Sequence, residues 1–151
     1  MKAVNQGTQA KVDARYQIML VLWFAFLSTI AIYFVVAQFI VQPALETLPN
    51  RMLTVVLAAL GTFMVVVSVV VKQKFLAQSV VQQQPGLVQT GLIVALAMCE
   101  AGALLGLVDL FVTGNRYYFI VLIIAALGIV FHFPRRNHLL AASYKNSADL
   151  R

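Results

Sequence analysis

The sequence predicts an all-α integral membrane protein with four transmembrane helices and both termini in the cytoplasm. Its 151 residues are 62% hydrophobic and only 11% charged, with a mean hydropathy of +0.89, whereas a soluble domain carries roughly 25% charged residues. Apolar runs of about 20 residues recur, and at about 1.5 Å per residue each can cross a hydrocarbon core of about 30 Å. The basic residues stand at the ends of these runs. A soluble globular fold is therefore nearly excluded.

The first predicted span is residues 16–41. It contains no charged residue and ends at Gln42-Pro43, where proline removes a backbone donor and disfavours further helix. The run is too long and too aromatic for a signal peptide, so we expect it to stay uncleaved behind a short polar tail at 1–15. Trp23 is expected either to anchor the span at the interface or to face a neighbouring helix.

The second and third predicted spans are residues 52–71 and 87–111. The many valines of the second are no objection to a helix, because in hydrocarbon only helices and closed barrels satisfy the backbone. We expect this helix to continue for a turn or two beyond Lys72 and to break at Pro85-Gly86. The third span is apolar except for Glu100 and Asp109.

The third span is followed by the turn-forming sequence Thr113-Gly114-Asn115-Arg116. Asp109, near the outer end of that span, is expected to reach water or to pair with Arg116. The fourth predicted span, residues 117–133, is the shortest and stops at Pro134, which leaves a polar tail at 134–151.

Charge placement predicts the orientation of this single four-helix domain. With four spans, both tails and the 72–85 segment share one side, and that side holds nine of the eleven Lys and Arg residues: Lys2, Lys11, Arg15, Lys72, Lys74, Arg135, Arg136, Lys145 and Arg151. Arg51 and Arg116 lie opposite. Cytoplasmic loops carry an excess of Lys and Arg. We therefore expect a multi-pass protein of the bacterial inner membrane, and we expect Arg135 and Arg136 to contact lipid headgroups.

Glu100 lies near the centre of the third span, where an ionised side chain costs roughly 2.5 to 3.5 kcal/mol. Hydrocarbon favours the neutral form of a carboxyl group, which suits a group that takes up and releases a proton. Two interpretations stay open: a proton-binding site, or a neutral glutamate that hydrogen-bonds a neighbouring helix or subunit.

Small residues line one face of the same span, beside Glu100. They are Gly91, Ala95, Cys99, Gly102, Ala103 and Gly106. Such a face lets another helix approach closely. It favours helix packing over a cofactor groove.

The remaining residues argue against several function classes. Cys99 is the single cysteine, so neither an intramolecular disulfide nor a cysteine metal cluster can form. The basic residues form no patch with interleaved aromatics, so nucleic acid is not an expected partner. Nucleophile, nucleotide and metal motifs are missing, which predicts no catalytic residues, no metal and no required cofactor.

His132, at the end of the fourth span, is the best candidate for a pigment or haem ligand, although an interfacial histidine is the simpler interpretation. The first and fourth spans are rich in Phe, Ile, Val and Leu. They suit lipid, carotenoid, (bacterio)chlorophyll or another protein's helices equally well.

Residues 83–108 resemble the second half of the c subunit of rotary ATP synthases. Gln84-Pro85 match the end of that family's polar loop, and Ala97-Met98-Cys99-Glu100-Ala101 match the context of its mid-membrane carboxylate. The chain looks like a divergent four-span relative of this hairpin, similar to small bacterial membrane proteins with an A-x-C-E-A segment. The resemblance implies that Glu100 is the proton-binding residue.

The sequence thus predicts a non-enzymatic accessory subunit of a larger respiratory or photosynthetic membrane complex. Its expected partners are lipids and larger membrane subunits, packed against the small-residue face. The alternatives are a proton-binding, c-like subunit that uses Glu100 and a pigment or haem carrier that uses His132.

Overall fold

The computed structural model describes residues 2–40 and 51–143, which fold into helices without any strand. The all-α prediction is confirmed for these residues. Their helices, in chain order, are α1 (Lys2–Ile40), α2 (Arg51–Val81), α3 (Pro85–Thr113), α4 (Phe119–Phe131) and α5 (Arg136–Ser143).

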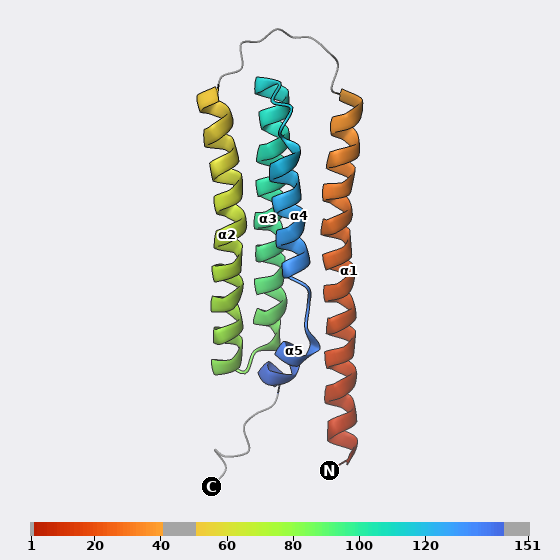
Figure 1. Ribbon diagram of the computed structural model, residues 1–151. Coiled ribbons are helices and arrows are strands. Elements are labelled where there is room, and N and C mark those ends of the chain that lie inside the picture. The colour runs from red at the N-terminus through yellow and green to blue at the C-terminus, as the bar shows by residue number, and fades with distance from the viewer. Residues whose placement is uncertain (1, 41–50, 144–151) are drawn as a thin grey trace.

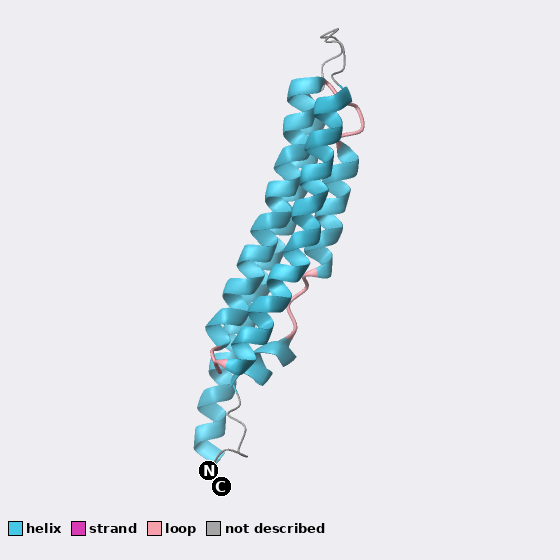
Figure 2. Ribbon diagram, turned by 90° about the vertical axis from the view of Figure 1, so that its left-hand side faces the viewer, coloured by secondary structure: helices cyan, strands magenta, loops and turns pink. Residues whose placement is uncertain are grey.

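The first four helices form an elongated bundle (Figures 1 and 2) and alternate in direction along it. In Figure 1, α3 and α4 lie between α2 and α1, and the short α5 lies at the end where α1 begins. We call this the α5 end and the opposite one the α3–α4 turn end. The turn between α2 and α3 also lies at the α5 end, as the predicted topology requires.

Three helices, α1, α2 and α3, are long and apolar enough to cross a membrane. A fourth span exists only if α4 and α5 are counted together, and these two helices are bent by 47°. By itself α4 has 13 residues, about 20 Å of helix against a hydrocarbon core of about 30 Å. It ends before Pro134, which cannot donate a backbone hydrogen bond. The structure therefore shows three or four candidate spans.

The first helix begins earlier than the predicted span. Backbone helix starts at Lys2 and runs through most of the predicted polar tail. Val12 is 3% exposed and belongs to the core, and the neighbouring Asp13 carboxylate pairs with Arg136 of α5 at 2.6 Å. The Asp13–Arg136 pair joins α1 to α5 before the apolar run begins, a feature that hydropathy alone does not reveal.

Contacts between helices depend on glycine. A Cβ added at Gly102 of α3 would lie 2.8 Å from the Gly61 carbonyl oxygen of α2, and one added at Gly61 would lie 3.0 Å from the Gly102 oxygen. A Cβ at Gly128 of α4 would lie 2.6 Å from the Val65 side chain and 3.0 Å from the Cys99 sulfur. The helix backbones thus approach closely, as is typical of membrane helix pairs.

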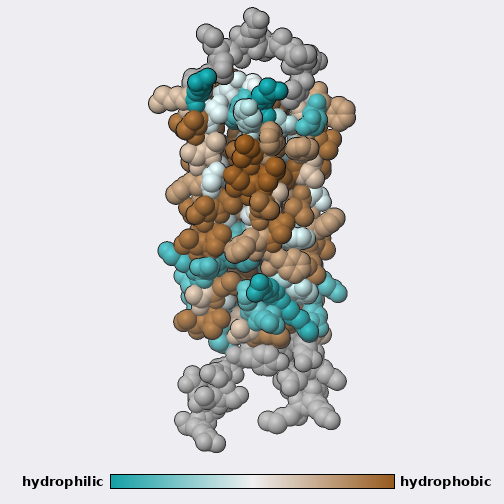
Figure 3. All heavy atoms as spheres, viewed as in Figure 1, coloured by the Kyte–Doolittle hydropathy of each residue, from teal (hydrophilic) through white to brown (hydrophobic). Residues whose placement is uncertain are grey.

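The outer surface is apolar over most of the bundle. In Figure 3 brown hydrophobic atoms cover its middle, while teal hydrophilic atoms gather at the α3–α4 turn end and in a band nearer the α5 end. Large side chains such as Phe39, Phe63 and Leu127 are more than half exposed. A continuous exposed apolar surface of this kind indicates a lipid or protein environment.

Candidate functional site

Polar side chains inside the bundle gather at three levels: the middle of α3, the C-terminal end of α4, and the α3–α4 turn. Each level brings together residues that are far apart in the sequence. The first two contain the predicted site residues Glu100 and His132.

Glu100 sits at the seam between α1 and α3. The Tyr33 hydroxyl of α1 donates a hydrogen bond to the Glu100 Oε1 at 2.9 Å. Both side chains are partly exposed, and the second carboxyl oxygen of Glu100 has no hydrogen-bond partner among the described residues. Half of this carboxyl group is therefore satisfied within the chain, and the other half is left for an outside hydrogen-bond partner.

His132 is buried, at 1% exposure, between α2 and α4. The Ser68 hydroxyl donates to the Val65 carbonyl at 2.6 Å, so its oxygen accepts from the His132 Nε2 at 2.8 Å. The Cys99 sulfur lies 3.4 Å from the same oxygen. This arrangement places the ring proton on Nε2. His132 Nδ1 is then an acceptor, and it is buried without a partner among the described residues.

Two side chains from other helices bind the backbone at the end of α4. Trp23 Nε1 of α1 donates to the Ile129 carbonyl at 2.7 Å, and Lys72 Nζ of α2 donates to the His132 carbonyl at 3.1 Å. The Ile129 carbonyl also accepts from the His132 backbone N–H at 3.0 Å, so the two side-chain bonds add to the backbone bonds that stabilise this helix end. Of the two alternatives for Trp23, the structure shows the one that faces a neighbouring helix.

A cavity of about 550 Å³ opens beside this helix end. Its walls come from α2, from the end of α4 and from the start of the α5 segment. They consist of Val69, Lys72, Gln73, Leu76, Val130, Phe131, His132, Phe133, Arg135 and His138. Burial lowers the pKa of His138 below its ordinary value, and the positive charges of Lys72 and Arg135 lower it further. The cavity is therefore basic.

Arg135 and Arg136, predicted together as headgroup ligands, have different surroundings. Arg135 is exposed and lines the cavity, whereas Arg136 forms the ion pair with Asp13. The structure thus leaves Arg135 as the freer of the two cations.

The α3–α4 turn is held by Asp109, whose predicted exposure to water or pairing with Arg116 is wrong. Asp109 is 1% exposed. It accepts from the Thr113 hydroxyl at 2.9 Å and from the Asn115 amide at 2.6 Å. Gly114 adopts the left-handed conformation that closes the helix, with φ 65°. Asp109 is internal because the turn folds its polar side chains back over the end of α3.

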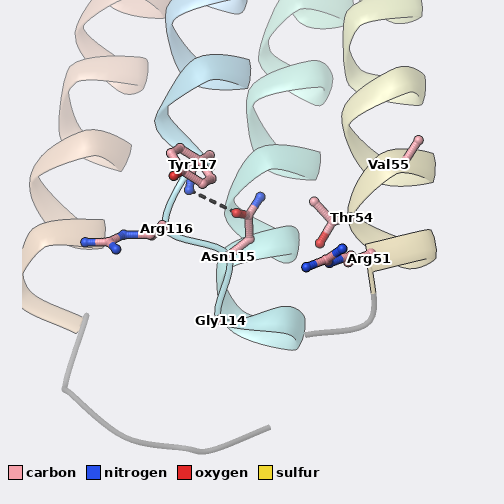
Figure 4. A pocket seen from close by; sticks show the side chains of 7 residues that line it. All are labelled: Arg51, Thr54, Val55, Gly114, Asn115, Arg116 and Tyr117. Carbon is pink, nitrogen blue, oxygen red and sulfur yellow. Dashed lines mark hydrogen bonds between the residues drawn. The ribbon is translucent and has the colours of Figure 1, made fainter. Parts of the chain in front are cut away.

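A second cavity, of about 470 Å³, lies against this turn (Figure 4). In Figure 4 the Arg51 side chain lies beside Thr54 on α2, while Arg116 points away from it on the opposite side of the turn. Asn115 Oδ1 accepts from the Tyr117 backbone N–H at 3.0 Å. The polar groups of this cavity shape the turn itself.

The small-residue face of α3 is used inside the chain. All six of its residues are buried: Gly91, Ala95, Cys99, Gly102, Ala103 and Gly106. Gly91 packs on Phe75 and Gly102 on Gly61, both of α2, while Gly106 packs on Val121 of α4. Helices of this same chain therefore occupy the face, and a partner subunit has to use another surface.

The prediction that His132 binds a pigment or haem stays a prediction. Its Nε2 is bonded to Ser68, and its Nδ1 is buried. An axial ligand must offer one nitrogen to the metal. Such binding would require the ring to turn out of the bundle.

The described side chains contain no group of three or more His, Cys, Asp or Glu residues placed to hold a metal ion. Comparisons of the chain with protein-family models, with curated proteins and with solved structures give no match. The resemblance of residues 83–108 to the c subunit is therefore a prediction that these comparisons leave untested.

Sequence reasoning did not identify Tyr33 and Lys72 as partners in these sites, and it gave contact with a neighbouring helix as only one of two alternatives for Trp23. Tyr33 stands within an apolar run that does not indicate its partner, and Lys72 was interpreted as a topology signal. One usable signal was present. Ser68 is a polar residue within a valine-rich span, and such residues often bond across helices.

Proposed function

We propose that this chain is a non-enzymatic accessory subunit of a larger energy-transducing complex in the bacterial inner membrane. The observation that carries the proposal is the half-satisfied carboxyl group of Glu100 at the α1–α3 seam. The many apolar side chains exposed on the bundle fit the same setting.

The physical argument concerns the free oxygen of Glu100. This residue lies near the middle of the 29-residue α3, a depth at which water is scarce and a lone polar group costs free energy. Tyr33 supplies one donor. A helix of a larger subunit laid over the seam supplies the second hydrogen-bond partner and covers the exposed Leu104, one turn along α3. The seam thus replaces the small-residue face as the proposed contact.

The test is site-specific photocross-linking in native membranes. A photoreactive residue at Leu104 is expected to give a discrete adduct with one larger membrane subunit. The matched control is Val66, which is equally apolar and 60% exposed on α2, and is expected to label lipid. Deletion of the chain should also lower the abundance of the complex that contains the adduct partner. Equal labelling at both positions, together with intact complexes after deletion, would reject the proposal.

A second candidate function, a proton-binding c-like subunit, is favoured by one specific contact. The hydroxyl of Tyr33 on the Glu100 carboxyl gives that group a fixed partner while leaving the side chain partly exposed. Carbodiimides react with protonated carboxyl groups, so labelling of Glu100 should be faster at acid pH and vanish in Glu100→Gln. Labelling that slows as the pH falls, or unchanged proton-coupled activity in that variant, argues for the accessory role alone.

Contacts with lipid, carotenoid or (bacterio)chlorophyll belong to the same proposal. An apolar groove of about 390 Å³ lies between α1 and α4 and includes Leu27, Phe34 and Ile123. Its shape and chemistry suit an acyl chain or a carotenoid. Its walls contain no histidine, so a chlorophyll there would need an axial ligand from elsewhere.

A further inference from the structure

The basic cavity at the end of α4 lies at the depth where hydrocarbon gives way to headgroups. Lys72 is 21 residues beyond Arg51 in the same helix, which places it about 32 Å away along the axis. That distance matches a hydrocarbon core of about 30 Å. Figure 3 shows a hydrophilic band near the α5 end of the bundle.

The cavity offers several hydrogen-bond donors and a positive field. The Lys72 ammonium gives one proton to the His132 carbonyl and keeps two for another acceptor. Arg135 adds a guanidinium, and His138 adds a ring nitrogen. None of the residues that line the cavity is acidic, and the nearby Asp13 pairs with Arg136. The positive charges that face this space are therefore left for an anion.

His132 borders this cavity, but both of its ring nitrogens are buried. Nε2 lies on the Ser68 hydroxyl, and Nδ1 has no accessible surface and no partner among the described residues. The side chains that can reach an occupant are therefore Lys72, Arg135 and His138. All three are donors or cations, so the cavity calls for an occupant with anionic oxygens.

We propose that this cavity binds the phosphate of an anionic phospholipid. The phosphodiester oxygens are bound by Lys72 and Arg135, and His138 lies in the same wall. Phosphate is matched by ammonium and guanidinium donors. The cavity volume of about 550 Å³ falls within the usual range for small-molecule sites, roughly 300 to 1,000 Å³. The inference goes beyond the accessory role and does not depend on it.

Binding to the purified, delipidated full-length chain in detergent tests the proposal. Three probes are compared by native mass spectrometry and by the shift in thermal unfolding: phosphatidylglycerol, phosphatidylcholine and inorganic phosphate. We expect phosphatidylglycerol to be retained and to raise the unfolding temperature, with no comparable effect from the other two. Equal effects of phosphatidylcholine would overturn the requirement for an anionic headgroup. An equal effect of inorganic phosphate would overturn the lipid as the source of the anion.

Variants link the binding to the cavity. Lys72→Gln combined with Arg135→Gln should weaken phosphatidylglycerol binding at least tenfold. The matched control, Lys11→Gln with Lys74→Gln, removes the same charge from exposed positions outside the cavity and should stay within twofold of the unmodified chain. Arg135→Gln alone changes an exposed residue between helices, so it retains the fold and should still weaken binding severalfold. Unchanged affinity in Arg135→Gln and in the double variant would overturn the site.

Discussion

The contacts of α2 with α3 differ in kind from those of α1 with the rest of the bundle. Between α2 and α3, the backbones of Gly61 and Gly102 meet directly, and Ser68 reaches His132 of α4 in a fully buried position. Across the α1 seam, the polar contacts of Trp23 and Tyr33 are only partly buried. The first set of contacts is closed to any outside molecule, while the second remains accessible.

This difference separates stability from function within one bundle. In a membrane the hydrophobic effect does not drive helices together, so close packing and hydrogen bonds carry the association. The contacts among α2, α3 and α4 combine close packing with hydrogen bonds and leave few polar groups without a partner. The α1 seam leaves one oxygen of Glu100 open. We therefore expect mutations in the α2–α3–α4 contacts to lower the free energy of unfolding most, and mutations at the α1 seam to lower it least.

The largest effect is expected from Gly102→Ala. The new Cβ would lie 2.8 Å from the Gly61 carbonyl oxygen, a backbone atom that cannot swing away. Forced overpacking of this kind typically costs about 1 to 3 kcal/mol, and we expect the upper end in reversible unfolding by dodecyl sulfate in mixed micelles. Gly86→Ala is the matched control, because its Cβ would meet only the end of the Arg15 side chain at 3.7 Å. Equal stability of the two variants would remove the basis for calling the α2–α3 contact closed.

A smaller loss is expected from Ser68→Ala. The substitution leaves the His132 Nε2 proton without its acceptor, and an unsatisfied buried donor costs about 1 to 3 kcal/mol. Ser79→Ala on the same helix is the control, since the Ser79 hydroxyl bonds only the Leu76 carbonyl of its own helix. In the same unfolding assay, Ser68→Ala should lower the free energy of unfolding more than Ser79→Ala does. If they lose equal stability, the Ser68–His132 bond contributes nothing beyond a local helix contact.

Hydropathy and charge predicted the all-α fold, the approximate positions of the long helices and the break at Pro85, because these depend on local sequence. They did not predict that α1 begins before the apolar run, where Asp13 forms an ion pair with Arg136 of α5. The burial of Asp109 was missed for a related reason. Its partners Thr113 and Asn115 surround it only after the turn has folded.

In the candidate sites too, local sequence predicts the position of a residue but not its partner. The position of Glu100 at mid-span can be read from the sequence, but its partner Tyr33 lies 67 residues away. The small face of α3 was correctly placed on one side of a helix, yet only the structure shows that α2 and α4 occupy it. One sequence defines which helix faces are able to pack closely; it does not define which neighbour packs there.

The smallest effect, and the sharpest comparison, is expected from Tyr33→Phe. The change removes one hydrogen bond to Glu100 while keeping the ring in the seam, and such bonds between membrane helices average about 0.6 kcal/mol. Tyr16→Phe is the control, because the Tyr16 side chain is also partly exposed on α1 and its hydroxyl has no hydrogen-bond partner among the described residues. The isolated chain should lose about 0.6 kcal/mol in the unfolding assay and gain carbodiimide labelling at Glu100, as its carboxyl group becomes more accessible. A loss of 2 kcal/mol or more would instead place the seam with the closed contacts, and the open oxygen of Glu100 would then no longer argue for a partner.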